Sequence, residues 1–491
     1  MSVSAPRFDN SYVRLPARLY ARQLPEAVSQ PETIRVNEGL ARKLGFDPKW
    51  LAAEEGAAVV AGSALLPGSE PIATAYAGHQ FGHFNPKLGD GRAVLLGEVL
   101  TENQERFDLQ LKGSGRTPFS RGGDGRCPLG PALREALVSE SMYAMGIPTT
   151  RVMAVAMTGE RVVRDAVLPG AVLVRVADSH IRIGTFEYLA AQGDLEGLEA
   201  LLGHACERHI SFHGSTSEMA ESLLSAVVQR QASLIAQWQL VGFIHGVMNT
   251  DNMLICGQTI DYGPCAFMNE YDPGTVFSSI DRHGRYAYGN QPRIAGWNLV
   301  RLARALLPLL GEEDEAVARA QGAIDGFPRF YADAHRAGLA KKLGLAELHE
   351  DDDEWIQSLL NAMHEAKADF TLTFRRLANL AGGASEAESA AVGSLEEGLG
   401  AWVEQWVARL AEQPMSAQAR GDAMREVNPI LIPRNHQVEA ALQSATEGEG
   451  FERFHRLADA IERPYDFRPE VAEYLQPPTS EQRVHQTFCG T

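Results

Sequence analysis

The spacing of apolar residues changes near residue 178 and divides the chain into two parts. Before that point, apolar residues alternate with polar ones or form short runs, as in half-buried and buried strands. The predicted strands cover residues 93–100, 107–112, 151–157, 160–164 and 171–176. After it, apolar residues recur at helical spacing over 221–241 and 297–310, which predicts core helices. Strands followed by helices predict the α+β class.

Further segments complete this outline. Residues 131–145 are predicted to form a helix with Pro131 at its start, and 36–44 are also helical. Residues 264–293 show little periodicity and are predicted to be a loop over a substrate entrance. Residues 381–397, rich in Ala, Gly, Glu and Ser, are predicted to be a loose connection. We therefore divide the chain into a β-rich lobe with an N-terminal extension, a helical lobe, and a helical C-terminal extension, over residues 1–178, 179–400 and 401–491.

Two polar clusters flank a short apolar run in the second part. The first, residues 245–252, reads His-Gly-Val-Met-Asn-Thr-Asp-Asn, and the second is Asp261-Tyr262-Gly263. The run 253–260 between them is predicted to be a strand that brings Asn252 and Asp261 to one side of a cleft. Their oxygens are hard ligands that suit Mg²⁺ or Mn²⁺. This order of loop, strand and Asp-aromatic-Gly is how kinase-like folds hold the metal on ATP.

The usual kinase base is missing from the first cluster. Asn252 follows His245 at the kinase spacing, but Val247 stands where the base Asp belongs and cannot accept a proton. A carboxylate appears instead at Asp251. Two interpretations stay open: the chain is an inactive kinase, or Asp251 serves a different transfer.

The first part carries residues suited to phosphate. Gly89-Asp90-Gly91-Arg92 is a glycine-rich turn before a predicted strand, where backbone amides can close over phosphates. The strand 107–112 ends in Lys112, which matches the kinase lysine that contacts phosphates. A loop rich in Gly and Arg follows and suggests an anion site; its arginines are Arg116, Arg121 and Arg126. Glu135 and Glu140 can both pair with Lys112, and spacing alone does not choose between them.

Composition limits the partners. The formal net charge of −18 argues against binding to nucleic acid and to anionic membranes. No apolar run reaches the roughly 18 residues of a membrane helix. The first residues also lack the apolar core of a secretory signal. We therefore expect a cytoplasmic protein, and a monomer.

The five cysteines show no CxxC pair and no zinc spacing. Four of them read as reduced thiols. Cys489 differs because it is the third residue from the end, where an exposed thiol can be redox-active. Cys265, which follows the Asp261-Tyr262-Gly263 motif, is a candidate partner for it.

Taken together, these motifs resemble the selenoprotein O family of the bacterial YdiU type. The resemblance covers nearly the whole chain and also includes Tyr76-Ala-Gly-His-Gln-Phe-Gly82 and the segment from Leu111 to Gly125. It implies a bilobal fold like that of protein kinases. It implies transfer of AMP from ATP to Ser, Thr or Tyr hydroxyls of proteins, with ATP bound in a flipped orientation and pyrophosphate released.

The resemblance also implies roles for single residues. Asp251 is the expected proton acceptor, Asn252 and Asp261 the ligands of Mg²⁺ or Mn²⁺, and Glu135 the partner of Lys112. Selenocysteine stands at the antepenultimate position of some members, where this chain has Cys489. The expected nucleotide-binding residues are Gly89, Gly91, Arg92, Lys112, Asp124, Gly125, Arg175, Arg182 and Asp261.

Three other functions are weighed against this one. The first is transfer of UMP, particularly with Mn²⁺. The second is an inert nucleotide-binding scaffold, which predicts ATP binding without turnover. The third is an ordinary phosphotransferase that acts on a small molecule. The retained metal ligands and the neighbouring Asp251 argue against the scaffold, because positioning and charge neutralisation contribute most to such transfers.

Overall fold

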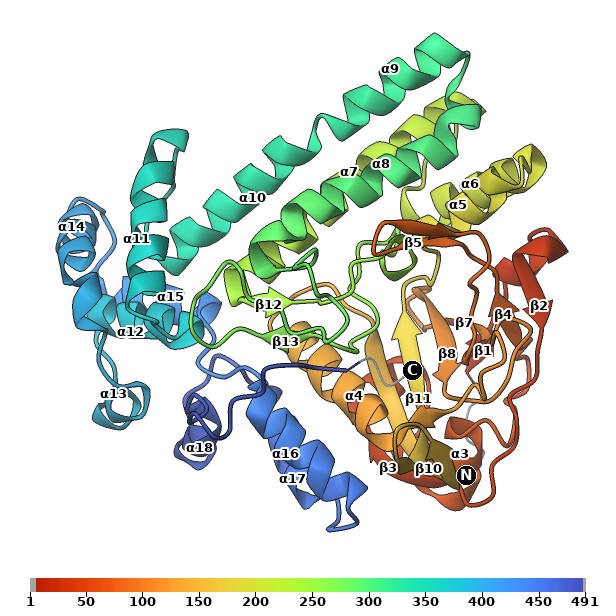
Figure 1. Ribbon diagram of the computed structural model, residues 1–491, viewed down its shortest axis with the longest axis horizontal. Coiled ribbons are helices and arrows are strands. Elements are labelled where there is room, and N and C mark those ends of the chain that lie inside the picture. Colours follow the sequence, from red (N-terminus) through yellow and green to blue (C-terminus); the bar gives the residue numbers. More distant parts are fainter. Residues whose placement is uncertain (1–5, 489–491) are drawn as a thin grey trace.

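The computed structural model describes residues 6–488 and separates them into two regions (Figure 1). The first region, coloured red and orange up to the yellow strand β11, is built around a large sheet, and the second, which runs from the yellow helices α5 and α6 through green to blue, is helical. The α+β class is therefore confirmed, with the sheet in the N-terminal part. The more specific likeness to protein kinases stays a prediction. None of the helices in residues 6–488 combines the length and the hydropathy that crossing a membrane requires.

Nine strands of the described chain form the large sheet, in the spatial order β2-β4-β7-β8-β11-β10-β3, with β1 beside β7 and β9 beside β11. The paired strands are antiparallel. Their bounds are β1 Arg7–Phe8, β2 Tyr20–Arg22, β3 Glu32–Val36, β4 Ile72–Thr74, β7 Ala93–Leu100, β8 Arg106–Lys112, β9 Cys127–Pro128, β10 Arg151–Val163 and β11 Val167–Ala177. Two small hairpins lie apart, from β5 (Gly78–Gln80) and β6 (His83–Asn85), and from β12 (Phe243–Ile244) and β13 (Ala266–Phe267).

The predicted strands agree with β7, β8 and β11, and Lys112 does end β8. One prediction was wrong: residues 151–157 and 160–164 do not form two strands but the single strand β10. The register shifts between Met157 and Arg161, and Gly159 has a φ of +73°. The glycine therefore marks a bulge inside one strand rather than its end.

One long helix connects the sheet with the C-terminal extension. Helix α4 (Leu129–Ala144) packs against β10 and β11 on one side and against α16 (Asn435–Thr446) and α17 (Glu452–Ile461) on the other. Apolar residues of all these elements form one buried cluster, including Leu133, Leu173 and Leu457. The extension therefore holds α4, and with it Glu135, against the sheet.

Further helices flank these elements. Three short ones follow β3: α1 (Glu38–Lys43), α2 (Pro48–Ala52) and α3 (Glu54–Val60). The helical region contains α5 Ile183–Ala191, α6 Leu195–His209, α7 Thr216–Val241, α8 Gln291–Leu310, α9 Glu313–Ile324, α10 Phe327–Lys342, α11 Asp353–Glu365, α12 Phe370–Gly382, α13 Glu386–Val392, α14 Gly400–Ala411, α15 Ala417–Val427 and α18 Ala472–Leu475. Helix α13 lies inside the segment 381–397, so the prediction of a loose connection there was wrong in part.

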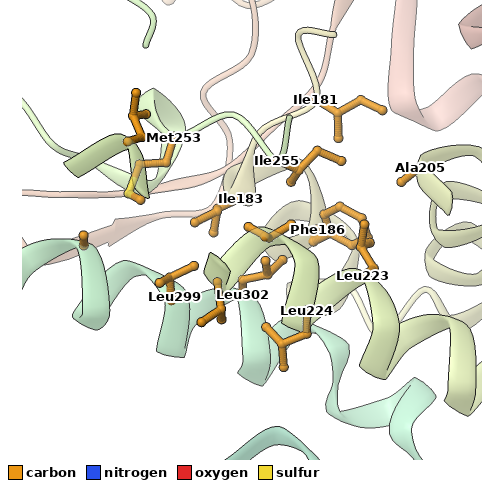
Figure 2. Close-up of a cluster of buried hydrophobic side chains, with 14 of the residues drawn as sticks. Ile181, Ile183, Phe186, Ala205, Leu223, Leu224, Met253, Ile255, Leu299 and Leu302 are labelled. Carbon is orange, nitrogen blue, oxygen red and sulfur yellow. The ribbon is translucent and has the colours of Figure 1, made fainter. Parts of the chain in front are cut away.

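Helices α5, α7 and α8 form the core beneath the chain that carries the two polar clusters. Ser215 and Glu218 form a capping box at the start of α7, and Gly242, with a φ of +72°, ends it and releases the chain into His245–Asn252. Figure 2 shows Met253 and Ile255 beside side chains of α5, α7 and α8, among them Phe186, Leu224 and Leu299. Burying these side chains anchors the polar residues on either side of them.

The run 253–260 is not a strand, contrary to the prediction. It contributes two isolated bridges, Leu254 with Arg182 and Thr259 with Thr149, and is otherwise turn and loop. Its apolar side chains are buried against helices, which produces the same apolar pattern as a buried strand. The two bridges nevertheless hold both ends of the run, so Asn252 and Asp261 still reach one cleft.

Candidate active site

A cleft of about 720 Å³ opens between the sheet and the helical region. Almost every site residue predicted from the sequence lines it, from both regions. These residues are Gly89, Gly91, Arg92, Lys112, Asp124, Gly125, Arg175, Arg182, Asp251, Asn252 and Asp261. Arg121 lines it as well, whereas Arg116 is exposed outside the lining. The cleft brings together segments from Tyr76 to Ile280, which are far apart in sequence.

A buried ionic cluster joins the two regions at the base of the cleft. The Lys112 Nζ lies 2.6 Å from Glu135 Oε2 and 2.8 Å from Asp261 Oδ1. The Arg175 guanidinium lies 2.6 Å from each of the same two carboxylates. Glu140, the alternative partner, instead accepts from the Arg151 guanidinium at 2.8 Å. Packing of α4 therefore selects Glu135 for Lys112.

Asp261 is held in its charged form. Its Oδ2 also faces Arg182 at 3.5 Å, so three cations surround one carboxylate. Burial opposes the charge, but Lys112, Arg175 and Arg182 outweigh burial and hold the pKa of Asp261 well below its usual range. Its backbone adopts a φ of +64°, an unfavourable conformation for a residue with a Cβ and one concentrated at functional sites. The surroundings therefore fix both the direction and the charge of this side chain.

Asp251 has a different environment. Burial raises its pKa to about 6, against the opposing effect of Arg182. The Gln80 amide donates to Asp251 Oδ2 at 3.1 Å, and Asp251 Oδ1 has no hydrogen-bond partner in residues 6–488. The Arg182 guanidinium donates to the backbone carbonyl of Asp251 at 2.6 Å. Asp251 is thus a carboxylate with one unsatisfied oxygen and a pKa suited to proton transfer near neutral pH.

Gly78 leaves the space that Asp251 occupies. A Cβ on Gly78 would lie 2.4 Å from Asp251 Oδ1, so only glycine accommodates the carboxylate here. We expect Gly78→Ala to displace Asp251 and to lower the rate of catalysis by roughly 100-fold, because misplacing a reacting group by about 1 Å has effects of that size. The measurement is kcat together with the thermal unfolding temperature.

Gly203→Ala is the matched control for this substitution. Gly203 lies in α6, and a Cβ there would have no atom within 4 Å. The control should keep its rate and its unfolding temperature. A Gly78→Ala protein with unchanged kcat would show that the position of Asp251 does not matter to the reaction.

Asn252 and Asp261 offer oxygens to a metal ion. The Asn252 amide nitrogen donates to the Val247 carbonyl at 3.0 Å, which leaves its oxygen for a cation. Residues 6–488 contain no group of three or more His, Cys, Asp or Glu side chains that could hold a metal by themselves. Mg²⁺ is usually held by one or two protein oxygens together with substrate phosphates, so this donor pair fits a metal that arrives with a nucleotide.

Glycines shape the opposite wall. A Cβ on Gly89, which has a φ of +75°, would lie 2.3 Å from the Phe119 ring, and one on Gly125, with a φ of +69°, would lie 1.9 Å from the Gly115 carbonyl oxygen. Both positions therefore require glycine. The Asp124 carboxylate accepts two bonds from Arg164, at 2.8 and 2.9 Å, and one from the Arg126 amide. Asp124 thus also orders the loop.

Two side chains of the candidate site were not predicted from the sequence. Gln80, the partner of Asp251, and Arg164, the partner of Asp124, both line the cleft. Gln80 lies in the Tyr76–Gly82 motif, which carried the family resemblance without a role for each residue. Arg164 directly follows β10, where no pattern distinguishes it from a solvated arginine.

Cys489, the predicted redox-active residue, lies outside the described residues. Cys265 is buried, and burial raises the pKa of its thiol to about 12. The Thr487 hydroxyl donates to the carbonyl of Pro264, the residue before Cys265, at 2.6 Å. The hypothesis that Cys489 is a redox-active thiol stays a prediction.

Comparison with known proteins identifies the family of the chain. The family model described as "Protein adenylyltransferase SelO" matches residues 4–462. The chain belongs to this family, and the protein is an enzyme of the nucleotidyltransferase class.

Its curated relatives carry a consistent name. A protein of a Bradyrhizobium species (strain BTAi1) is 54% identical over 492 residues, with all of both chains covered. One of Methylorubrum populi is 54% identical, with 99% of both chains covered. One of Rhizobium etli is 52% identical, with 99% of this chain and 97% of its own covered. Each of the three is named "Protein nucleotidyltransferase YdiU".

Proposed function

We propose that the protein transfers AMP from ATP to Ser, Thr or Tyr hydroxyls of acceptor proteins and releases pyrophosphate. The observation that carries this proposal is the pairing of a missing base at Val247 with a buried carboxylate at Asp251, beside Asn252 and Asp261 in one cleft. The family and the names of its relatives support nucleotidyl transfer. They also support proteins as the acceptors.

The positive charge of the cleft supports binding of ATP in the flipped orientation. An ordinary kinase places one lysine on the phosphates, whereas this cleft is lined by Lys112, Arg92, Arg121, Arg175 and Arg182. Cations distributed over both walls suit a triphosphate whose β- and γ-phosphates lie away from the acceptor. The remaining predicted residues are Gly89, Gly91, Asp124 and Gly125. They shape loops whose backbone amides are proposed to bind the phosphates of the nucleotide.

The proposed reaction is a single displacement. Asp251 accepts the proton of the acceptor hydroxyl, whose oxygen forms a bond to the α-phosphorus of ATP. The bond between the α-phosphorus and the bridging oxygen breaks, and pyrophosphate leaves with that oxygen. Asn252 and Asp261 would hold Mg²⁺ or Mn²⁺, which would supply charge neutralisation on the phosphates. Lys112 and Arg175 keep Asp261 charged and directed into the cleft.

The mass that the protein gains from nucleotide tests this assignment. After incubation with ATP and Mg²⁺ or Mn²⁺, self-modified protein should gain AMP. UTP in place of ATP should give little product, and a preference for UTP would favour the alternative of UMP transfer. A gain of phosphate alone would show a phosphotransferase. The monomeric state and the cytoplasmic location stay predictions.

A further inference from the structure

The charge of one stretch differs from that of the rest of the chain. Residues 282–311 contain five arginines and no Asp or Glu, in a protein with a formal net charge of −18. The arginines are Arg282, Arg285, Arg293, Arg301 and Arg304. None of them forms an ion pair with a carboxylate of residues 6–488, whereas most arginines of the cleft do. This segment therefore carries positive charge that no ion pair within residues 6–488 neutralises.

The structure gathers part of this charge around an aromatic ring. Arg301 and Arg304 stand on α8 with Trp297, at the three- and four-residue spacings that share one helix face. The guanidinium of Arg301 lies 4.6 Å from the Trp297 ring centroid, and that of Arg285, from the preceding loop, lies 4.8 Å from it. These contacts hold both guanidinium groups in place.

The same group lies close to the segment that carries the proposed proton acceptor. The centroid of the His79 imidazole lies 5.3 Å from that of the Trp297 ring and 4.9 Å from that of the Phe84 ring. Phe84 is 42% exposed. The backbone amide of His79 donates to the Thr250 hydroxyl at 2.7 Å, and Thr250 precedes Asp251. The surface formed by Phe84, Arg285, Trp297, Arg301 and Arg304, here called the basic-aromatic surface, therefore begins beside the proposed proton acceptor.

The gathered charges are incompletely compensated. Burial and the neighbouring Arg304 lower the pKa of the Arg301 guanidinium, against the opposing effect of Glu187. The Nε atoms of Arg285 and Arg301 are buried without hydrogen-bond partners in the described chain. Like charges held together and donors left unpaired both cost free energy. Such an arrangement is typical of a surface that becomes satisfied when a ligand binds.

We infer that the basic-aromatic surface binds an acidic segment of the acceptor protein, next to the hydroxyl that is modified. This inference rests on the proposed function and names the class of acceptor. From Trp297 to Arg304 the helix rises about 10 Å, the length of about three residues of extended peptide. Carboxylates on such a segment match the guanidinium groups, and an apolar side chain on it matches Phe84 and Trp297. A long polyanion fits less well, because the rest of the protein is strongly acidic.

The test uses synthetic peptides of one length, each with a single Ser flanked by Glu, Gln or Lys. Fluorescence anisotropy without nucleotide gives Kd, and transfer from α-labelled ATP gives KM. The wild-type protein should prefer the Glu peptide over the Gln peptide, and the Lys peptide should bind weakest. Arg301→Gln combined with Arg304→Gln should raise Kd and KM for the Glu peptide by about 10-fold, the effect of two exposed charge pairs. The Kd and KM of the Gln peptide should change little.

Arg453→Gln combined with Arg463→Gln is the matched control. Both arginines are exposed near α17 and form no ion pair with a carboxylate of residues 6–488, so the control removes the same charge elsewhere. It should keep the preference for Glu. The loss of affinity for the Glu peptide that the Arg301 and Arg304 substitutions cause should also be smaller at high ionic strength.

The outcomes separate this inference from the proposed function. If no peptide and no self-modification takes label from ATP, the proposed function fails, while the anisotropy still reports on the surface. If transfer occurs but the Glu peptide has no advantage, or both double variants behave alike, the docking inference is wrong. Tighter binding of a single-stranded oligothymidylate, lost with Arg301 and Arg304, would also overturn it and assign the surface to nucleic acid.

Discussion

Asp261→Ala is expected to lower kcat by about 100- to 1,000-fold, the effect of removing one electrostatic element of a phosphate site. Asp261 is one of two predicted metal ligands, and it is held charged by Lys112, Arg175 and Arg182. Removing its carboxylate leaves these cations facing one another and removes one of the two predicted metal ligands. Asn252→Ala should lower kcat to a similar extent. The measurement is the rate of label incorporation from ATP at saturating metal.

Folding must be separated from catalysis in this experiment. Breaking a buried ionic cluster by removing one member costs about 3–5 kcal/mol, so thermal unfolding of Asp261→Ala is measured alongside its rate. Asp261→Asn keeps the size of the side chain and should lose nearly as much activity. Asp165→Ala, in the exposed turn between β10 and β11, should change neither quantity. Near-normal turnover in folded Asp261→Ala would rule out the assigned metal site.

Asp251→Asn is expected to lower kcat by about 100- to 10,000-fold and to remove a pH dependence. Burial raises the pKa of Asp251 to about 6. Below that pH the carboxyl is protonated and cannot accept a proton, and above it the carboxylate is available. The rate of the wild-type protein should therefore rise as pH increases through about 6, and the residual rate of Asp251→Asn should not.

Glu187 provides the control, because it titrates in the same range. Burial raises its pKa to about 7, and it lies 2.5 Å from both His79 Nδ1 and the Thr250 hydroxyl. Glu187→Gln should keep the rise through about pH 6 because Asp251 is still present. A rise that disappears in Glu187→Gln and survives in Asp251→Asn would move the role of proton acceptor away from Asp251.

The sequence predicted the elements whose pattern is local. The alternation over 107–112 and the apolar run over 93–100 set β8 and β7, and therefore the place of Lys112. The run 253–260 was misread because apolar side chains buried by helices look like those of a strand. Glu135 and Glu140 lie on one helix at a spacing that puts them on different faces, and only the packing of α4 decides which one meets Lys112.

For the candidate site as well, local features were predicted from the sequence and contacts between distant segments were not. Asn252, Asp261 and Asp251 were predicted because metal and proton chemistry restrict the residue types. The cluster of three cations on Asp261 and the contact between Gly78 and Asp251 join distant segments, so no local pattern predicts them. The excess of arginine over 282–311 is visible in the sequence. Its place beside Asp251 depends on the fold of α8 and the β5–β6 hairpin.

Which phosphate of ATP reaches the acceptor tests the central claim most directly. The protein is incubated with metal and with ATP labelled at either the α- or the γ-phosphate, and its own modification is followed, so no natural acceptor is needed. The account predicts that α-labelled ATP labels the protein, that γ-labelled ATP does not, and that pyrophosphate is released in equal amount. Labelling from the γ-phosphate with release of ADP would contradict it. ATP binding without labelling from either position would favour the inert scaffold.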